Sequence, residues 1–90
     1  MNQKKILVTN EVGLHARPAA QFVEAASQFN SEIKIRYDGK EANAKSILNV
    51  LSLGISQGAE IELIAEGADE DQALAFLIDL IESNFPENDD

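Results

Sequence analysis

Apolar and polar residues alternate along two stretches of the chain, Glu32–Tyr37 and Glu60–Glu66. Alternation with a period of two is typical of a β-strand that buries one face, so we predict a strand in each stretch. Ile64 breaks the second alternation, and we expect its side chain on the outer face of the sheet. A short apolar run within Lys5–Thr9 predicts a further strand near the N-terminus.

A two-residue turn signal, Asp38-Gly39, directly follows the first alternating stretch. This pair is favoured in tight hairpins because both of its residues tolerate the positive φ angles of the turn. We therefore predict a short returning strand over Lys40–Asn43, antiparallel to the strand before it.

Apolar residues recur every three or four positions in two other stretches, which predicts amphipathic helices. The first helix is expected over Ala16–Gln28, and the other lies between Asp69 and Pro86. The residues expected to face the core are Ala19, Ala20, Val23 and Ala26 in the first helix, with Phe22 as a further candidate, and Ala73, Leu74, Leu77, Ile78, Leu80 and Ile81 in the other.

Residues suited to helix ends define a third, short helix and the start of the last one. Ser46 is a favoured N-cap, so we predict a helix over Ile47–Leu53, with Gly54 in its C-cap region. We expect Asp69 to cap the last helix, with Gln72 completing a pair that resembles a capping box.

The predicted element order is β-α-β-β-α-β-α. Short strands and amphipathic helices cover one another's apolar faces, which predicts an α+β fold with helices packed on one sheet. The chain has 90 residues, 44% of them hydrophobic, so we expect one domain over residues 1–90, with a frayed acidic tail at Pro86–Asp90. The pattern alone leaves the strand order open.

The single histidine of the chain, His15, lies where the first strand-to-helix loop becomes a helix. Pro18 fits a first helical turn, whose N–H groups have no intrahelical acceptor. Those N–H groups and the helix dipole favour an anion such as phosphate, and Arg17 adds a guanidinium suited to its oxygens. A histidine here is suited to carry a phosphoryl group, although a lone histidine more often serves as a structural ring or a helix cap.

Composition disfavours several other classes of function. The chain has no cysteine and one histidine, so we expect no metal site and no cofactor. A net charge of −9 disfavours binding to nucleic acid, and the absence of a long apolar run disfavours a signal peptide or membrane insertion. We therefore expect a cytoplasmic protein. Arg17, Lys40 and Lys45 remain candidates for a local basic patch despite the acidity.

Two motifs resemble those of a known family. Gly13–Ala19, which reads Gly-Leu-His-Ala-Arg-Pro-Ala, resembles the active-site signature of HPr, the histidine phosphocarrier family of the bacterial sugar phosphotransferase system. Lys45–Gly54 resembles the regulatory serine region of the same family, and the similarity extends from Lys5 to about Phe85. The resemblance implies a two-layer, open-faced β-sandwich with three helices and an antiparallel sheet of strand order 1-4-2-3.

The resemblance also implies a phosphoryl carrier and not an autonomous enzyme. A ring nitrogen of His15, Nδ1 in the family, would accept the phosphoryl group of phospho-enzyme I and pass it to enzyme IIA domains. Arg17 would neutralise the phosphate, and the backbone N–H groups of Ala16 and Arg17 would receive its oxygens. Ser46 would be the substrate of HPr kinase/phosphorylase in Gram-positive-type bacteria, where the product acts with the catabolite-control repressor. Members of the family are mostly monomers.

The short helix after Ser46 is too apolar to bury every side chain. Helical spacing places Ile47 and Val50 inward. Leu48 and Leu51 then point elsewhere, and we expect them to form an exposed patch beside His15. A fully buried leucine pair is the alternative. The candidate docking residues are Ala16, Ala20, Ile47, Leu48 and Leu51.

Two other hypotheses remain open. The first is a regulatory module of the same family, in which phosphorylated Ser46 controls a repressor and His15 is idle. The second is an unrelated α/β interaction domain, which would require both motif matches to be coincidental. Uptake of a phosphoryl group from enzyme I separates the carrier hypothesis from both.

Overall fold

The computed structural model describes residues 1–85, so the expectation of a frayed tail at Pro86–Asp90 lies outside the described residues. Within that range the elements follow the predicted order. They are β1 Asn2–Leu7, α1 Ala16–Ala26, β2 Glu32–Tyr37, β3 Lys40–Asn43, α2 Ile47–Ser52, β4 Glu60–Glu66 and α3 Glu70–Glu82.

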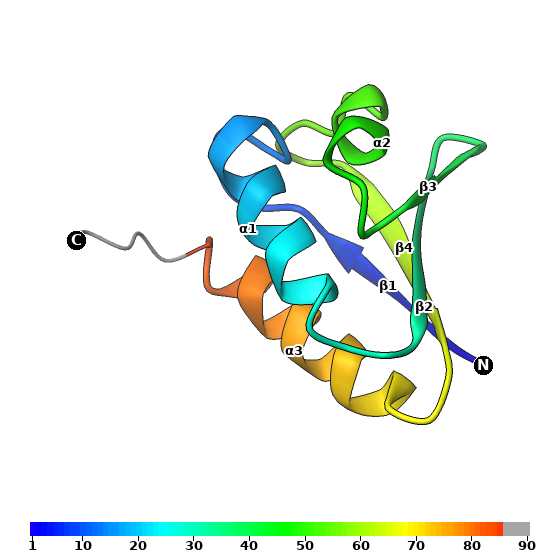
Figure 1. The fold of residues 1–90 in the computed structure, drawn as a ribbon. Helices are drawn as coiled ribbons and strands as arrows, with labels where there is room; N and C mark the ends of the chain where they lie inside the picture. Colours follow the sequence, from blue (N-terminus) through cyan, green and yellow to red (C-terminus); the bar gives the residue numbers. More distant parts are fainter. Residues whose placement is uncertain (86–90) are drawn as a thin grey trace.

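The four strands form one sheet in the order β1-β4-β2-β3, and every neighbouring pair is antiparallel. This confirms the α+β class and the strand order that the resemblance implied. The register places Ile35 opposite Leu63 and Ile6 opposite Ile61, so apolar side chains of adjacent strands share the inner face. The three helices cover that face, with α1 and α3 side by side and α2 packed against α1 (Figure 1).

The hydrophobic core lies between the sheet and the helices. Phe22 of α1 and Leu77 of α3 are fully buried there, as is Val50 of α2. The core therefore draws on all three helices, although α2 contributes one buried residue and each of the longer helices contributes four. None of the helices in residues 1–85 has the length and apolar character that crossing a membrane requires.

The first strand begins earlier and ends earlier than the expected Lys5–Thr9, because β1 covers Asn2–Leu7. Val8 lies beyond the strand, where its N–H donates to the Ala59 carbonyl and its own carbonyl accepts from Gly58, both at 2.8 Å. After β1, the backbone of Val8 is therefore hydrogen-bonded to the residues that precede β4.

Helix α1 buries most of the expected face, because Ala19 and Ala26 are buried and Val23 is partly buried against the core. Phe22, a further candidate in the sequence, is fully buried, whereas Ala20 is exposed and was wrongly assigned to the core. Alanines occur all round this helix, so hydrophobic spacing does not decide which of them face inward. The helix also ends at Ala26, before the expected Gln28, because the N–H groups of Gln28 and Phe29 bond to carbonyls three residues back.

Ile64 lies on the outer face of the sheet, as expected, between Gln3 of β1 and Lys34 of β2. Its side chain is nevertheless 7% exposed. Ile64 lines a small hollow together with the long side chains of Lys34 and Arg36 on β2, which accommodates an apolar residue on an uncovered sheet face.

Asp69 occupies the N-cap position of α3, as predicted, but its side chain makes no capping hydrogen bond, so the expected pair with Gln72 is wrong. The Asp69 carboxylate instead accepts hydrogen bonds from the backbone N–H groups of Asn30 and Ser31, each at 2.9 Å, and from the Ser31 hydroxyl. These bonds hold the α1–β2 connection against the start of α3. They also lower the pKa of the Asp69 carboxyl, chiefly through the Ser31 hydroxyl and then through the Asn30 N–H. Just before α3, the Gly67 N–H donates to the carboxylate of Glu70, in the first turn of the helix, at 3.0 Å.

Candidate functional site

His15 is the N-cap residue of α1, and its side chain is exposed. Its backbone is extended, with φ −103° and ψ −173°, and its carbonyl accepts the Ala19 N–H at 2.8 Å. Within the described chain, the imidazole makes no capping hydrogen bond to the helix that it precedes. The ring is therefore accessible to a partner at the positive end of the helix dipole.

The loop that carries His15 packs on the backbone of Ile55 and Ser56. Leu14 is 1% exposed, and its N–H donates to the Ile55 carbonyl at 3.0 Å. Gly13 has φ +63°, and a Cβ added to it would collide with the Ile55 carbonyl and the Ser56 backbone. Only glycine fits this close approach, so the motif glycine sets the position from which the histidine leaves the loop.

Arg17 lies in the first turn of α1, two residues after His15, and is exposed. It lines an open hollow of about 620 Å³ together with Thr9, Asn10, Glu11, Val12, Pro18, Gln21, Asn84 and Phe85. The hollow joins the β1–α1 loop, the start of α1 and the residues after α3. Arg17 thus places a cation at the same helix end as the imidazole, as an anion site requires.

Ser46 is the N-cap of α2, as predicted, and its hydroxyl accepts the Asn49 N–H at 3.4 Å. The residue is half-buried, and its carbonyl accepts the Val50 N–H at 3.0 Å. Because α2 packs against α1, the structure brings the serine motif and the histidine motif onto adjacent helices (Figure 1).

The outer surface of α2 is apolar and exposed. Leu48 is 76% exposed and Leu51 is 36% exposed, so the alternative of a buried leucine pair is wrong. Ile47, which spacing placed inward, is also 36% exposed, because Val50 and Leu53 fill the space beneath the helix. Ala16 and Ala20 of α1 are exposed as well, so each of the five candidate docking residues has an exposed surface.

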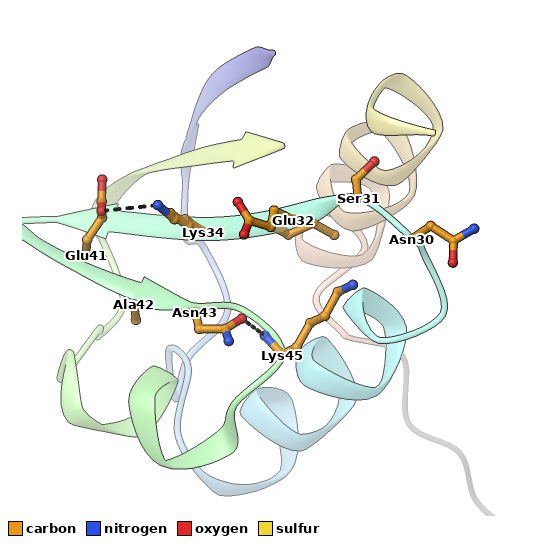
Figure 2. Close-up of a pocket in the computed structure, with 9 residues that line it drawn as sticks. Asn30, Ser31, Glu32, Lys34, Glu41, Ala42, Asn43 and Lys45 are labelled. Atoms are coloured by element: carbon orange, nitrogen blue, oxygen red, sulfur yellow. Dashed lines mark hydrogen bonds and ion pairs between the residues drawn. The ribbon is translucent and has the colours of Figure 1, made fainter. Parts of the chain in front are cut away.

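Lys45 does not join a basic patch with Arg17. Its ammonium group donates to the Phe29 carbonyl at 2.7 Å, just beyond the C-terminal end of α1. Lys45 lines a separate hollow of about 350 Å³ between the β2–β3 hairpin and the α1–β2 connection, where its side chain extends toward Asn30 and Ser31 (Figure 2). An eleven-residue helix is roughly 16 Å long, so Lys45 and Arg17 lie at opposite ends of α1.

Asn10 belongs to the site, although its place in the strand-to-helix loop predicted no role for it. Its side chain is 7% exposed and its amide nitrogen donates to the Gly13 carbonyl at 2.6 Å. An Asn three residues before a Gly is a local signal of such a turn. Over residues 1–85, no group of three or more His, Cys, Asp and Glu residues is arranged to hold a metal ion.

Comparisons with known proteins agree with the motifs. A family model described as the PTS HPr component phosphorylation site matches residues 2–83. The crystal structure of HPr-C-His from Thermoanaerobacter tengcongensis superposes with a TM-score of 0.94 at 52% identity, covering 98% of this chain and 99% of that one. A phosphocarrier protein HPr from Bacillus anthracis gives a TM-score of 0.87 at 44% identity, covering 89% and 95%. Crh, a Bacillus subtilis catabolite repression protein described as a swapped dimer, gives 0.75 at 44% identity, covering 97% and 100%.

Proposed function

The chain belongs to the HPr family of the phosphotransferase system, and from that membership we propose that it carries a phosphoryl group on His15. The group arrives from the phosphohistidine of enzyme I and leaves to an enzyme IIA domain. The protein acts as a carrier and a kinase substrate, without catalytic activity of its own. The observation that carries the proposal is the exposed imidazole at the N-cap of α1, within the family's histidine motif.

The chemistry follows from this placement. A ring nitrogen of neutral His15 attacks the phosphorus, a new N–P bond forms, and the N–P bond to the histidine of enzyme I breaks. The attacking atom is the ring nitrogen that carries no proton, because only that nitrogen has a free lone pair. The N–H groups of Ala16 and Arg17 and the Arg17 guanidinium meet the phosphoryl oxygens as charge develops on them. Transfer to enzyme IIA is the same displacement with the carrier as the leaving group.

Phosphorylation by enzyme I with phosphoenolpyruvate tests this function directly. The parent protein is expected to acquire one acid-labile phosphate, and His15→Ala is expected to acquire none while retaining the parental fold. Because the His15 side chain makes no capping bond, its loss leaves the described hydrogen bonds of α1 intact. A parent protein that takes up no phosphate would favour the regulatory module in which His15 is idle.

We further propose that Ser46 is a regulatory phosphorylation site, made and removed by HPr kinase/phosphorylase where the organism is of the Gram-positive type. The phosphoserine would then act with the catabolite-control repressor. Its position supports this role, because a phosphate adds roughly two negative charges beside the apolar surface of α2. Ser46→Asp is expected to accept phosphate from enzyme I more slowly than Ser46→Ala, and equal rates would remove the inhibitory role.

The docking surface that we propose for enzyme I and enzyme IIA is the exposed apolar patch formed by Ala16, Ala20, Ile47, Leu48 and Leu51. Contiguous exposed apolar side chains are typical of protein–protein interaction sites. We propose that the protein works as a cytoplasmic, single-domain monomer without metal or cofactor. Because an HPr dimer and a swapped Crh dimer occur among the similar structures, sedimentation at working concentration is the direct test of the monomer.

A further inference from the structure

Asn10 closes the turn that leads to His15 by two hydrogen bonds. Its backbone carbonyl accepts the Gly13 N–H at 3.1 Å, and its side-chain nitrogen donates to the Gly13 carbonyl at 2.6 Å. The orientation of the amide follows from chemistry, because only its NH₂ group can donate to a carbonyl. Both polar groups of the Gly13 backbone are thus held by one residue.

The side-chain bond acts on the peptide unit that lies one residue before the peptide leading into His15. The Gly13 carbonyl belongs to the peptide joining Gly13 to Leu14, and the Leu14 N–H on the same peptide donates to Ile55 at 3.0 Å. This peptide plane is therefore fixed at both of its polar atoms, by Asn10 on one side and by the α2–β4 connection on the other. Only Leu14, which is 1% exposed, separates this plane from the peptide that leads into His15, so fixing the plane restricts the direction in which His15 leaves the loop.

The side-chain oxygen of Asn10, unlike its side-chain nitrogen, makes no hydrogen bond within residues 1–85. Asn10 Oδ1 is buried and has no hydrogen-bond donor among residues 1–85. A buried acceptor without a donor is costly, whereas a buried amide–carbonyl bond contributes a modest net stabilisation. The two terms oppose each other, so stability alone gives little reason for an asparagine at this position.

We propose that Asn10 is a positioning residue for phosphoryl transfer. Its amide holds the Gly13–Leu14 peptide plane so that the His15 ring meets the incoming phosphorus in line. This inference rests on the proposed carrier function. Asn10 acts through the loop, by its two hydrogen bonds to Gly13.

The test compares Asn10→Ala with the parent in phosphorylation by enzyme I, with the concentration of this protein varied. We expect kcat to fall about tenfold or more, because small misplacements of a reacting group are costly. We expect KM to change by less than about twofold, because the docking patch is untouched. We expect the melting temperature to shift by less than about 4 °C, because the variant loses the hydrogen bond to Gly13 and also loses the cost of the buried Oδ1 without a donor.

Ser31→Ala is the matched control, because Ser31 and Asn10 are the two buried polar residues within the described chain. Ser31 bonds to Asp69 beyond the far end of α1. Its loss is expected to lower the melting temperature by roughly 4–8 °C and to leave kcat unchanged. If Asn10 had a merely structural role, Asn10→Ala would also lower the melting temperature and leave kcat unchanged.

Two results would overturn the inference. One is a folded Asn10→Ala or Asn10→Asp variant that transfers phosphate at the parental kcat, since neither side chain offers the neutral amide donor. The other needs no variant: Gly13 and Leu14 amides that exchange hydrogen as fast as an unstructured peptide would show that the loop is not held. In both cases a parent that still accepts phosphate leaves the carrier function intact, whereas a parent that accepts none removes the carrier function itself.

Discussion

The two long helices of this protein begin with residues whose side chains do not cap them, for opposite reasons. His15 precedes α1 and leaves its imidazole in solvent, whereas Asp69 precedes α3 and bonds Asn30 and Ser31 beyond the far end of α1. The start of α1 therefore keeps its polar groups available to a partner. The start of α3 directs its carboxylate to the neighbouring loop.

The buried polar residues differ in the same way. Ser31, near Asp69, has its hydroxyl and its N–H paired, whereas Asn10, near His15, keeps one buried oxygen without a donor in residues 1–85. Glycine contributes at both ends, because Gly13 packs on the Ile55 carbonyl and Gly67 packs on Ser31. We infer that hydrogen bonding near Asp69 serves stability, and that the arrangement near His15 serves transfer. Variants at the two ends are therefore expected to separate rate from stability.

The largest effect is expected from Arg17→Ala at the start of α1. Loss of the guanidinium that we propose to stabilise developing phosphate charge is expected to slow transfer from enzyme I roughly tenfold to 100-fold. The free energy of unfolding is expected to change by less than about 1 kcal/mol, because Arg17 is an exposed charge. Lys40→Ala removes an exposed cation from the β2–β3 hairpin and is the control. Equal slowing in both variants would mean that general charge, and not Arg17, governs the rate.

Gly67→Ala is expected to show the reverse pattern. Gly67 has φ +154°, and an added Cβ would lie 2.6 Å from Ser31 Oγ and 2.7 Å from Ser31 Cα. Backbone strain and the clash together are expected to cost about 2–3 kcal/mol in chemical denaturation. Gly39→Ala is the control, since Gly39 also has a positive φ but nothing lies within 4 Å of its added Cβ. Its cost is expected to be about 1 kcal/mol.

For Gly67→Ala, the transfer rate measured well below the melting temperature is expected to equal that of the parent. A variant that keeps its stability but loses transfer would contradict the separation of the two ends.

A smaller effect is expected from the docking patch. Leu48→Ser removes an apolar side chain that is 76% exposed, so stability is expected to change by less than about 0.5 kcal/mol. KM for phosphorylation by enzyme I is expected to rise about tenfold, with a smaller change in kcat, because partner binding loses apolar burial. Phe76→Ser removes an exposed side chain from α3 and is expected to leave KM unchanged. Indistinguishable KM values for Leu48→Ser and the parent would exclude Leu48 from the interface.

Local patterns in the sequence predicted the elements that depend on neighbours in the chain. The Asp38-Gly39 signal predicted a hairpin, and both residues have positive φ, +54° and +78°. Ser46 was predicted to cap α2, and its hydroxyl accepts the Asn49 N–H. Alternation predicted β2 and β4 at their observed bounds, because burial of one sheet face leaves a period of two.

Local patterns did not predict contacts between residues that are far apart in the sequence. Asp69 satisfies every local rule for an N-cap, but its partners Asn30 and Ser31 lie 39 and 38 residues away in the sequence. Ala20 was misassigned because alanine is equally acceptable in the core and on the surface of a helix. The exposed histidine was placed correctly because its loop, its proline and its helix are all local features, whereas the hold of Asn10 on Gly13 needed the structure.

The smallest effect is expected from the charge on Asp69, and it depends on pH. Hydrogen bonds from Ser31 and Asn30 lower the pKa of this carboxyl in the folded protein below its ordinary value of 3.8. The folded state therefore binds the proton more weakly than the unfolded state, so the contribution of Asp69 is fully present above that value and is lost as the pH falls below it. Asp69→Asn is expected to melt at a lower temperature than the parent near pH 7, and the difference is expected to shrink toward about pH 3. Asp79→Asn, which removes an exposed carboxylate from the same helix, is the control for net charge. If both variants follow the same pH profile, the stability of this end of the molecule does not depend on the Asp69 hydrogen bonds, and the contrast with the His15 end loses its physical basis.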